Sequence, residues 1–306
     1  MIIPGLERSR WVSVAAWTLG FALLVAACIA VGSQSGSLLQ AWRAIESHRW
    51  AVVPLVALPV VCLFFASMSF LVLTRRFGRV GVVEMVALLG AAWLLNYLPL
   101  KPGVAGRIAY HAAVNKISVQ QSILVVLQTI AVGLACFGIQ FALSLALAMV
   151  TPSSGEVFRG CVLLAPVGFA AIAWTALSRW ERWPHAWRYA ASFLFRYLDS
   201  LVWGVRYALV LHLAGGTPSV AGCAAIASVS QSSALIPIGG NAIGLREWAV
   251  GLTTEALGDG FLRGGMSLSQ GLAAELLNRA GEIAASIPVG LACAWWVAKR
   301  LKAHRN

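Results

Sequence analysis

The chain has 306 residues, of which 59% are hydrophobic and only 11% are charged. Its mean hydropathy of +0.80 is far from the balance of a soluble domain, so the composition predicts an integral membrane protein. The 23 basic residues exceed the 11 acidic ones, which gives a formal net charge of +12. Most basic residues fall in short loops between apolar runs, where they set topology and meet anionic lipid. Nucleic-acid binding is therefore not expected.

The cysteines and histidines show no pattern that is typical of a metal or redox site. The six cysteines lie singly within apolar segments, and the five histidines are scattered without ligand spacing. No metal and no cofactor is expected. No polar stretch is long enough to fold separately, so we interpret residues 1–306 as a single integral membrane domain with a first half at about 1–150 and a second at about 151–306.

Six apolar runs are long enough to cross a hydrocarbon core of about 30 Å. They cover residues 11–32, 50–74, 117–150, 157–177, 191–213 and 267–298. The first run is interpreted as a retained helix. The alternative for this run is a lipoprotein signal that ends at Cys28.

Two further regions, 80–116 and 218–258, are apolar on both sides of a Pro/Gly-rich break. Proline removes a backbone donor and glycine permits unusual conformations, so neither region is an ordinary spanning helix. Each is two crossings, one crossing with a surface helix, or a re-entrant hairpin. Hairpins are favoured because the second limbs are short and interrupted by polar residues.

The basic loops support this topology. With two hairpins, the clusters after the second span, after the fourth span and at the C-terminus fall on the side of Arg8 and Arg10, which the positive-inside rule makes cytoplasmic. The hairpins then open from opposite sides and form an inverted repeat. The predicted fold is thus an all-α polytopic membrane protein with about six transmembrane helices, two re-entrant hairpins and cytoplasmic termini. Two Ser-x-x-Gln matches, Ser118 with Gln121 and Ser267 with Gln270, add weak support.

The breaks are also where charge is expected inside the membrane, at a cost of roughly 2.5–3.5 kcal/mol for each charge on insertion scales. The second limb of each hairpin would present free N–H groups and the positive end of a helix dipole. Arginine beside these groups can bind a phosphate bidentately, so the site suits an anionic head group. The residues expected to bind the substrate are Asn96, Lys101, Gly103, Arg107, Gly239, Gly240, Asn241, Gly244 and Arg246.

A second set of residues is expected to gate or support the site. On the last span Glu275, Arg279 and Glu282 recur at steps of four and three and share a helix face. Glu247 is expected to orient Arg246, or to act as a proton-coupling carboxylate. The whole supporting set is Pro99, Pro237, Glu247, Glu275, Asn278, Arg279 and Glu282.

Some of these charges have a purely structural alternative. Glu275 could pair with Arg279, and Asp199 with Arg196 or Arg206, and such pairs would only hold helices together.

At these motifs the chain resembles the flippase-like membrane region of the lysylphosphatidylglycerol synthases, over residues 11–298. The first-half pattern is matched by Asn96, Leu98, Pro99, Lys101, Gly103, Arg107 and Ser118, and the second-half pattern by Pro237, Gly244, Arg246, Glu247 and Arg279. The chain departs from the family at Val104, where an acidic residue is usual, and at Gln128-Thr129, where a Glu-Arg pair is usual. Residues 241–242 are Asn-Ala instead of Gly-Gly.

The resemblance implies a lipid flippase of a bacterial inner (cytoplasmic) membrane that lacks the soluble synthase domain. The expected substrate is an anionic lipid or a polyprenyl-phosphate-linked head group, and no enzymatic activity is expected because no catalytic constellation is found. The alternatives are a non-transporting subunit of a lipid-modification complex and a membrane-embedded lipid-linked transferase. The expected partners are a membrane lipid and either a second copy of the chain or a lipid-modifying enzyme.

Overall fold

A computed structural model describes residues 49–97, 102–150, 155–180, 185–235, 242–257, 261–263 and 265–305, and a few isolated positions before them. The two predicted breaks, at 96–107 and 235–247, lie outside these residues in part, at 98–101 and 236–241. Most of the first predicted span also lies outside them. The candidates that lie outside with them are Pro99, Lys101, Pro237, Gly239, Gly240 and Asn241.

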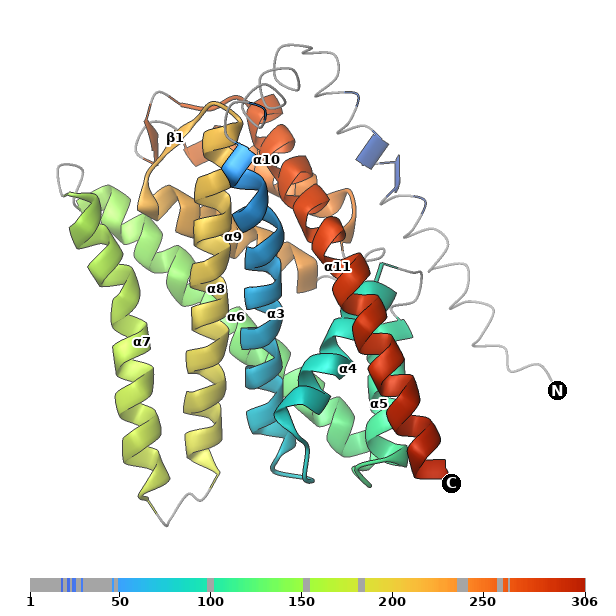
Figure 1. The fold of residues 1–306 in the computed structure, drawn as a ribbon. Helices are drawn as coiled ribbons and strands as arrows, with labels where there is room; N and C mark the ends of the chain where they lie inside the picture. Colours follow the sequence, from blue (N-terminus) through green and yellow to red (C-terminus); the bar gives the residue numbers. More distant parts are fainter. Residues whose placement is uncertain are drawn as a thin grey trace, which may run out of the picture.

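Helices make up almost all of the described chain (Figure 1). They are η1 (Arg49–Ala51), α3 (Val52–Thr74), α4 (Val82–Leu95), α5 (Pro102–Ala113), α6 (Val119–Val150), α7 (Glu156–Ser178), α8 (Ala186–Leu213), α9 (Val220–Leu235), α10 (Leu245–Leu257) and α11 (Leu268–Arg305). Two short strands, β1 (Thr217–Pro218) and β2 (Leu262–Arg263), pair antiparallel. The predicted all-α architecture is confirmed.

Four of the helices are long and apolar enough to cross a membrane. They cover Arg49–Thr74, Val119–Met149, Glu156–Ser178 and Leu268–His304 and match four of the predicted spans. The predicted span at 191–213 is also a helix, α8, whose 28 residues are long enough to cross. It is less apolar because Asp199 and Arg206 lie on its buried face. The protein is a multi-pass helical membrane protein.

The helices follow the same order of lengths twice. A long helix, two short helices and a long helix occur as α3 to α6 and again as α8 to α11, with α7 between the two sets. The guanidinium of Arg188, near the start of α8, donates to the carbonyl of Val72, near the end of α3, at 3.0 Å. Because α3 and α8 are therefore antiparallel, the short pair that follows α3 starts at one end of the bundle and the pair that follows α8 starts at the other (Figure 1). Re-entrance of these pairs into a membrane stays a prediction.

The two sets of helices pack across each other. α3 lies along α8, α4 packs on α11, and α9 packs on α6. Small residues allow the close approach of α4 and α11. A Cβ at Gly90 would lie 2.5 Å from the sulfur of Cys293, and one at Gly290 would lie 2.5 Å from Cβ of Leu94. The first short helix of each half is thus fixed to the last long helix of the other half.

Matching capping boxes begin α6 and α11. The Ser118 N–H donates to Oε1 of Gln121 at 3.0 Å, and the Gln121 N–H donates to Oγ of Ser118 at 3.2 Å. The corresponding distances for Ser267 and Gln270 are 2.9 and 3.3 Å. Each box satisfies two of the N–H groups that a helix start leaves without partners. The Ser-x-x-Gln match in the sequence therefore marks equivalent positions in the two halves.

The basic segments gather at one end of the bundle. Arg188 contacts the end of α3, and a hollow at the same end is lined by Arg79, Asn115, Arg300 and His304. The segments at 75–79 and 299–305 therefore lie at the same end as Arg188, as the loop charges predicted.

Candidate functional site

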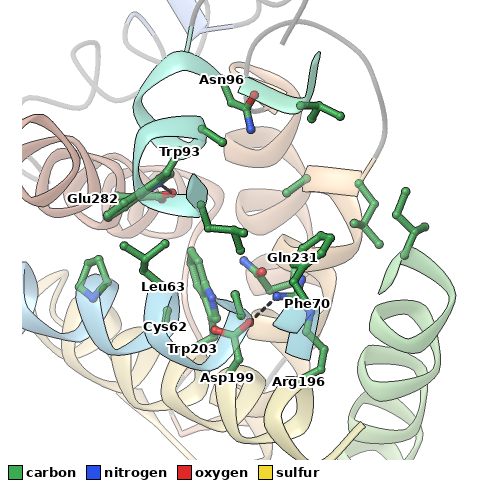
Figure 2. Close-up of a pocket in the computed structure, with 18 of the residues that line it drawn as sticks. Cys62, Leu63, Phe70, Trp93, Asn96, Arg196, Asp199, Trp203, Gln231 and Glu282 are labelled. Carbon is green, nitrogen blue, oxygen red and sulfur yellow. Dashed lines mark hydrogen bonds and ion pairs between the residues drawn. The ribbon is translucent and has the colours of Figure 1, made fainter. Parts of the chain in front are cut away.

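A cavity of about 450 Å³ lies between the two sets of helices (Figure 2). Side chains from α3, α4, α5, α6, α8, α9 and α11 line it, and most of them are apolar or aromatic. The charged residues in its walls are Arg107, Arg196, Asp199, Arg206 and Glu282. Among the described lining residues, three arginines against two carboxylates leave one net positive charge.

Arg107 supplies the charge that is not balanced. It projects from α5 and is 8% exposed, and its guanidinium carbon lies 4.0 Å from the centre of the Phe70 ring. Among the residues that the structure describes, no hydrogen bond or ion pair reaches it. Burial of an unpaired ion costs several kcal/mol, and a cation–π contact of this kind recovers only about 2 kcal/mol. Among the described residues that line the cavity, Arg107 is therefore the cation that no acidic side chain neutralises.

The opposite wall comes from α8 and holds two further arginines. Arg196 donates to Oδ2 of Asp199 at 2.5 Å, which confirms one of the pairings considered from the sequence. Arg206 stacks on Trp203, with its guanidinium carbon 3.7 Å from the ring centre. Three buried atoms of this wall have no hydrogen-bond partner among the described residues, namely Nε of Arg196, Oδ1 of Asp199 and Nε of Arg206. This wall thus keeps both an acceptor and a donor unused.

Two amide side chains complete the polar lining. Asn96 follows the last residue of α4, and Gln231, 7% exposed, comes from α9. Both line the cavity in Figure 2, together with Trp93 and Phe70. The first short helix of each half therefore brings one amide to the same cavity. The predicted role of Asn96 in substrate binding stays a prediction.

Gly103 has a packing role that explains its small size. A Cβ at this position would lie 2.4 Å from the carbonyl oxygen of Ala92 and 2.7 Å from Oδ1 of Asn96. Only glycine lets α5 approach α4 this closely, and the approach brings Arg107, one turn further along α5, to the cavity. Gly103 is not one of the residues that line the cavity.

Arg246 lies behind the cavity wall. It is 1% exposed and is not a lining residue. Its Nε donates to Oε1 of Glu275 at 2.5 Å, and its Nη2 donates to Oε2 of Glu282 at 3.0 Å. The predicted role of Arg246 in substrate binding stays a prediction, and in this structure two carboxylates hold its guanidinium.

Glu247 pairs with a different arginine from the one expected. Its Oε1 accepts from Nε of Arg279 at 3.0 Å, and its Oε2 accepts from the N–H of Gly244 at 2.7 Å. Gly244 has a φ of 85°, a conformation that glycine adopts without strain. Glu247 therefore orients Arg279 and the start of α10, and not Arg246. The structural alternative in which Glu275 pairs with Arg279 along α11 is also wrong, because each of them bonds across to α10.

Arg206 extends this network to the cavity. Its Nη2 donates to Oδ1 of Asn278 at 2.7 Å and lies 3.8 Å from a Glu282 oxygen. The amide of Asn278 donates in turn to Oε2 of Glu275 at 3.2 Å. Three of the four predicted supporting residues of α11, Glu275, Asn278 and Glu282, thus belong to one buried network, which ends at the cavity through Arg206 and Glu282. The fourth, Arg279, pairs with Glu247.

Four contributing residues were not found from the sequence. Trp93 donates its Nε1 proton to Oε1 of Glu282 at 3.3 Å, the Tyr207 hydroxyl donates to Glu275, and Trp203 and Gln231 line the cavity. A signal was present in the chain, since Trp203 and Tyr207 lie one turn apart on α8 with Asp199 one turn before them. Aromatic residues with polar atoms on the charged face of a span indicate a buried polar network.

Comparisons of the chain with protein-family models, with curated proteins and with solved structures found no match. The resemblance to the membrane region of the lysylphosphatidylglycerol synthases rests on the sequence motifs and stays a prediction.

Proposed function

We propose that the protein moves a lipid with an anionic head group across its membrane. The head group would occupy the central cavity, and the hydrocarbon chains would stay in the bilayer. A membrane protein whose interior holds a cavity with charged residues in its walls, at the junction of two oppositely directed sets of helices, has an arrangement that is common among secondary transporters.

One observation carries the proposal, namely that the buried guanidinium of Arg107 in the cavity wall has no hydrogen bond or ion pair to any described residue. Charged residues inside a membrane protein are expensive, and they mark substrate or ion pathways. Purely structural ions elsewhere in this interior have partners, as Arg246 has with Glu275 and Glu282. Arg107 differs from them because its partner would arrive with the substrate.

The charge of the cavity supports a phosphate as that partner. One net positive charge is neutralised by one phosphodiester, and guanidinium binds phosphate with paired N–H donors. The amides of Asn96 and Gln231 supply further polar contacts in the same cavity. The unused acceptor on Asp199 suits a hydroxyl or ammonium group on the head group.

The short helix pairs would act as re-entrant hairpins. In this proposal they bring Asn96, Arg107 and Gln231 to the middle of the membrane from opposite sides, so that the cavity opens to one side at a time. The network of Arg246, Glu275 and Glu282 would hold the second hairpin to α11 during the cycle.

The proposal can be tested in proteoliposomes. Phosphatidylglycerol with a fluorescent head-group-proximal label is placed in both leaflets, and dithionite then bleaches the outer leaflet. Protein that moves lipid makes the inner pool accessible. Arg107→Gln is expected to slow this movement about 10- to 100-fold, because a hydrogen bond to a charged group contributes about 1.5–3 kcal/mol and 1.4 kcal/mol is a factor of ten.

The matched control is Arg179→Gln, which removes the same charge from an exposed position at the end of α7. This variant should move lipid at the unmodified rate. Equal rates in the Arg107 and Arg179 variants, or no movement by the unmodified protein, would refute the proposed function.

A further inference from the structure

The two long helices that share a capping box differ in the face that follows it. Eight residues after its cap Ser118, α6 has Val126. Eight residues after its cap Ser267, α11 has Glu275. Where α11 has Arg279 and Glu282, twelve and fifteen residues after its cap, α6 has an isoleucine and a glycine. The ionic face of α11 is therefore replaced by an apolar face on α6.

The ionic face of α11 closes the line of contact between α10 and α11, which we call the α10–α11 seam. Between α10 and α11, Arg246 binds Glu275 at 2.5 Å, and Arg279 binds Glu247 at 2.9 Å. Further along, a Cβ on Gly271 would lie 2.9 Å from Cα of Gly251, so the two backbones touch. Ion pairs and glycine contacts leave no room for a lipid chain on this side.

The equivalent seam between α5 and α6 has no such closure. Within residues 102–113 and 119–150, no hydrogen bond or ion pair joins α5 to α6. The polar residues of α6 near the seam bond elsewhere: Thr129 donates to the carbonyl of Val125, four residues back, and Gln128 to the hydroxyl of Tyr189 at 2.7 Å. The cavity meets this seam at three apolar side chains, Val104, Val126 and Ile130.

The apolar path continues to the outer surface of α6. Ile123, Leu124 and Leu127 are exposed and lie beside the two lining residues of α6 on the same helix. In a membrane this outer face contacts hydrocarbon. A continuous apolar strip therefore runs from the Arg107 cavity to the bilayer across α6.

We propose that the seam between α5 and α6 is the opening through which the hydrocarbon chain of a bound lipid leaves the cavity. This inference rests on the proposed function, and it adds a site for the chain to the site for the phosphate. The chain lies against Val104, Val126 and Ile130 while the phosphodiester binds Arg107. Burial of the chain here costs no desolvation of charge, whereas a path between α10 and α11 would have to break buried ion pairs.

Photolabelling tests the position of the chain directly. Phosphatidylglycerol with a diazirine near the middle of one acyl chain is added to the purified protein, and labelled peptides are identified by mass spectrometry. Labelling is expected on α5 and on residues 123–130 of α6. The Arg107→Gln protein should lose most of this labelling and keep the labelling of Phe169 and Ile172, two exposed residues of α7 that contact bulk lipid.

A chemical crosslink across the seam tests its use during transport. In a background without the six natural cysteines, Val104→Cys and Ile130→Cys are joined by a short bismaleimide, and each single-cysteine protein treated in the same way is the control. Linkage should reduce lipid movement at least tenfold below the rate of the same double-cysteine protein before the reagent is added. The treated single-cysteine proteins measure the part of this loss that an adduct at Val104 or Ile130 causes without a link, and the linked protein should be slower than both.

The outcomes separate the two proposals. A linked protein that moves lipid at the unlinked rate, or labelling concentrated on α10 and α11, would overturn the α5–α6 opening and leave the proposed function intact. If the unlinked protein moves no lipid, the proposed function fails, and the labelling pattern alone then decides whether a chain occupies the seam.

Discussion

Substitution of Arg246 by methionine should be among the most damaging single changes in the chain. The guanidinium is 1% exposed and bonds to Glu275 and Glu282, which are themselves buried. Methionine fills a similar volume but leaves Glu275 with only Tyr207 and Asn278 as donors. Removal of one partner from a buried ion pair costs about 3–5 kcal/mol, because the remaining charge stays buried. The unfolded population should therefore rise about 100- to 4,000-fold, at 1.4 kcal/mol for each factor of ten.

A second substitution separates this cost from lost packing. Arg246→Met combined with Glu275→Leu removes one charge of each sign, and Glu282 keeps Arg206 at 3.8 Å and the indole of Trp93 at 3.3 Å. Replacement of a buried ion pair by apolar groups is often neutral or stabilising. The double variant should therefore regain most of the stability that the single variant loses.

The assay is reversible unfolding in mixed micelles by increasing SDS, followed by tryptophan fluorescence. Equal stability of the single variant and the unmodified protein would show that Arg246 is not held by its carboxylates. Arg246→Lys adds a functional test, because lysine keeps the charge but has no paired donors. If Arg246 binds substrate, this variant should lose lipid movement while its stability changes little.

Three further changes test other parts of the structure by the same unfolding assay. Gly103→Val should destabilise the protein by about 1–3 kcal/mol through overpacking against the Ala92 carbonyl. The control is Gly106→Ala, where no atom lies within 4 Å of the new Cβ, and this variant should be as stable as the unmodified protein or gain about 0.5–1 kcal/mol. Equal losses of stability in the two variants would show that α5 does not pack as described. Ser267→Ala removes the acceptor of the first capping bond of α11 and should cost about 1 kcal/mol, and no loss would mean that water replaces the cap. Tyr207→Phe removes a donor to a buried carboxylate and should cost about 1.5–3 kcal/mol; a loss below 0.5 kcal/mol, roughly a single weak contact, would contradict the bond.

The helical order could be read from the sequence because its signals are local. Apolar runs gave the long helices, Pro/Gly-rich breaks gave the paired short helices, and Ser-x-x-Gln marked the starts of α6 and α11. The spacing of Glu275, Arg279 and Glu282 correctly placed them on one buried face of α11.

The partners of those residues could not be read in the same way. Residues four apart on a helix are neighbours, so Glu275 and Arg279 looked like a pair. Each of them instead reaches α10, where Arg246 and Glu247 stand next to each other in the sequence and point to different residues of α11. Which of two adjacent side chains meets which partner depends on the rotation of one helix against the other, and a single sequence does not carry that rotation. For the same reason the α8 wall of the cavity, with Trp203 and Arg206, was not predicted as part of the site.

The cross-packing of the short helices limits how the protein can move. α4 is fixed to α11, and α9 to α6, so neither half of the chain can tilt as a rigid unit without pulling its own short helix away from the other half. If the protein moves lipid as proposed, a body that tilts during that movement would combine helices from both halves. The unit that moves would then differ from the unit whose order of helices occurs twice along the chain.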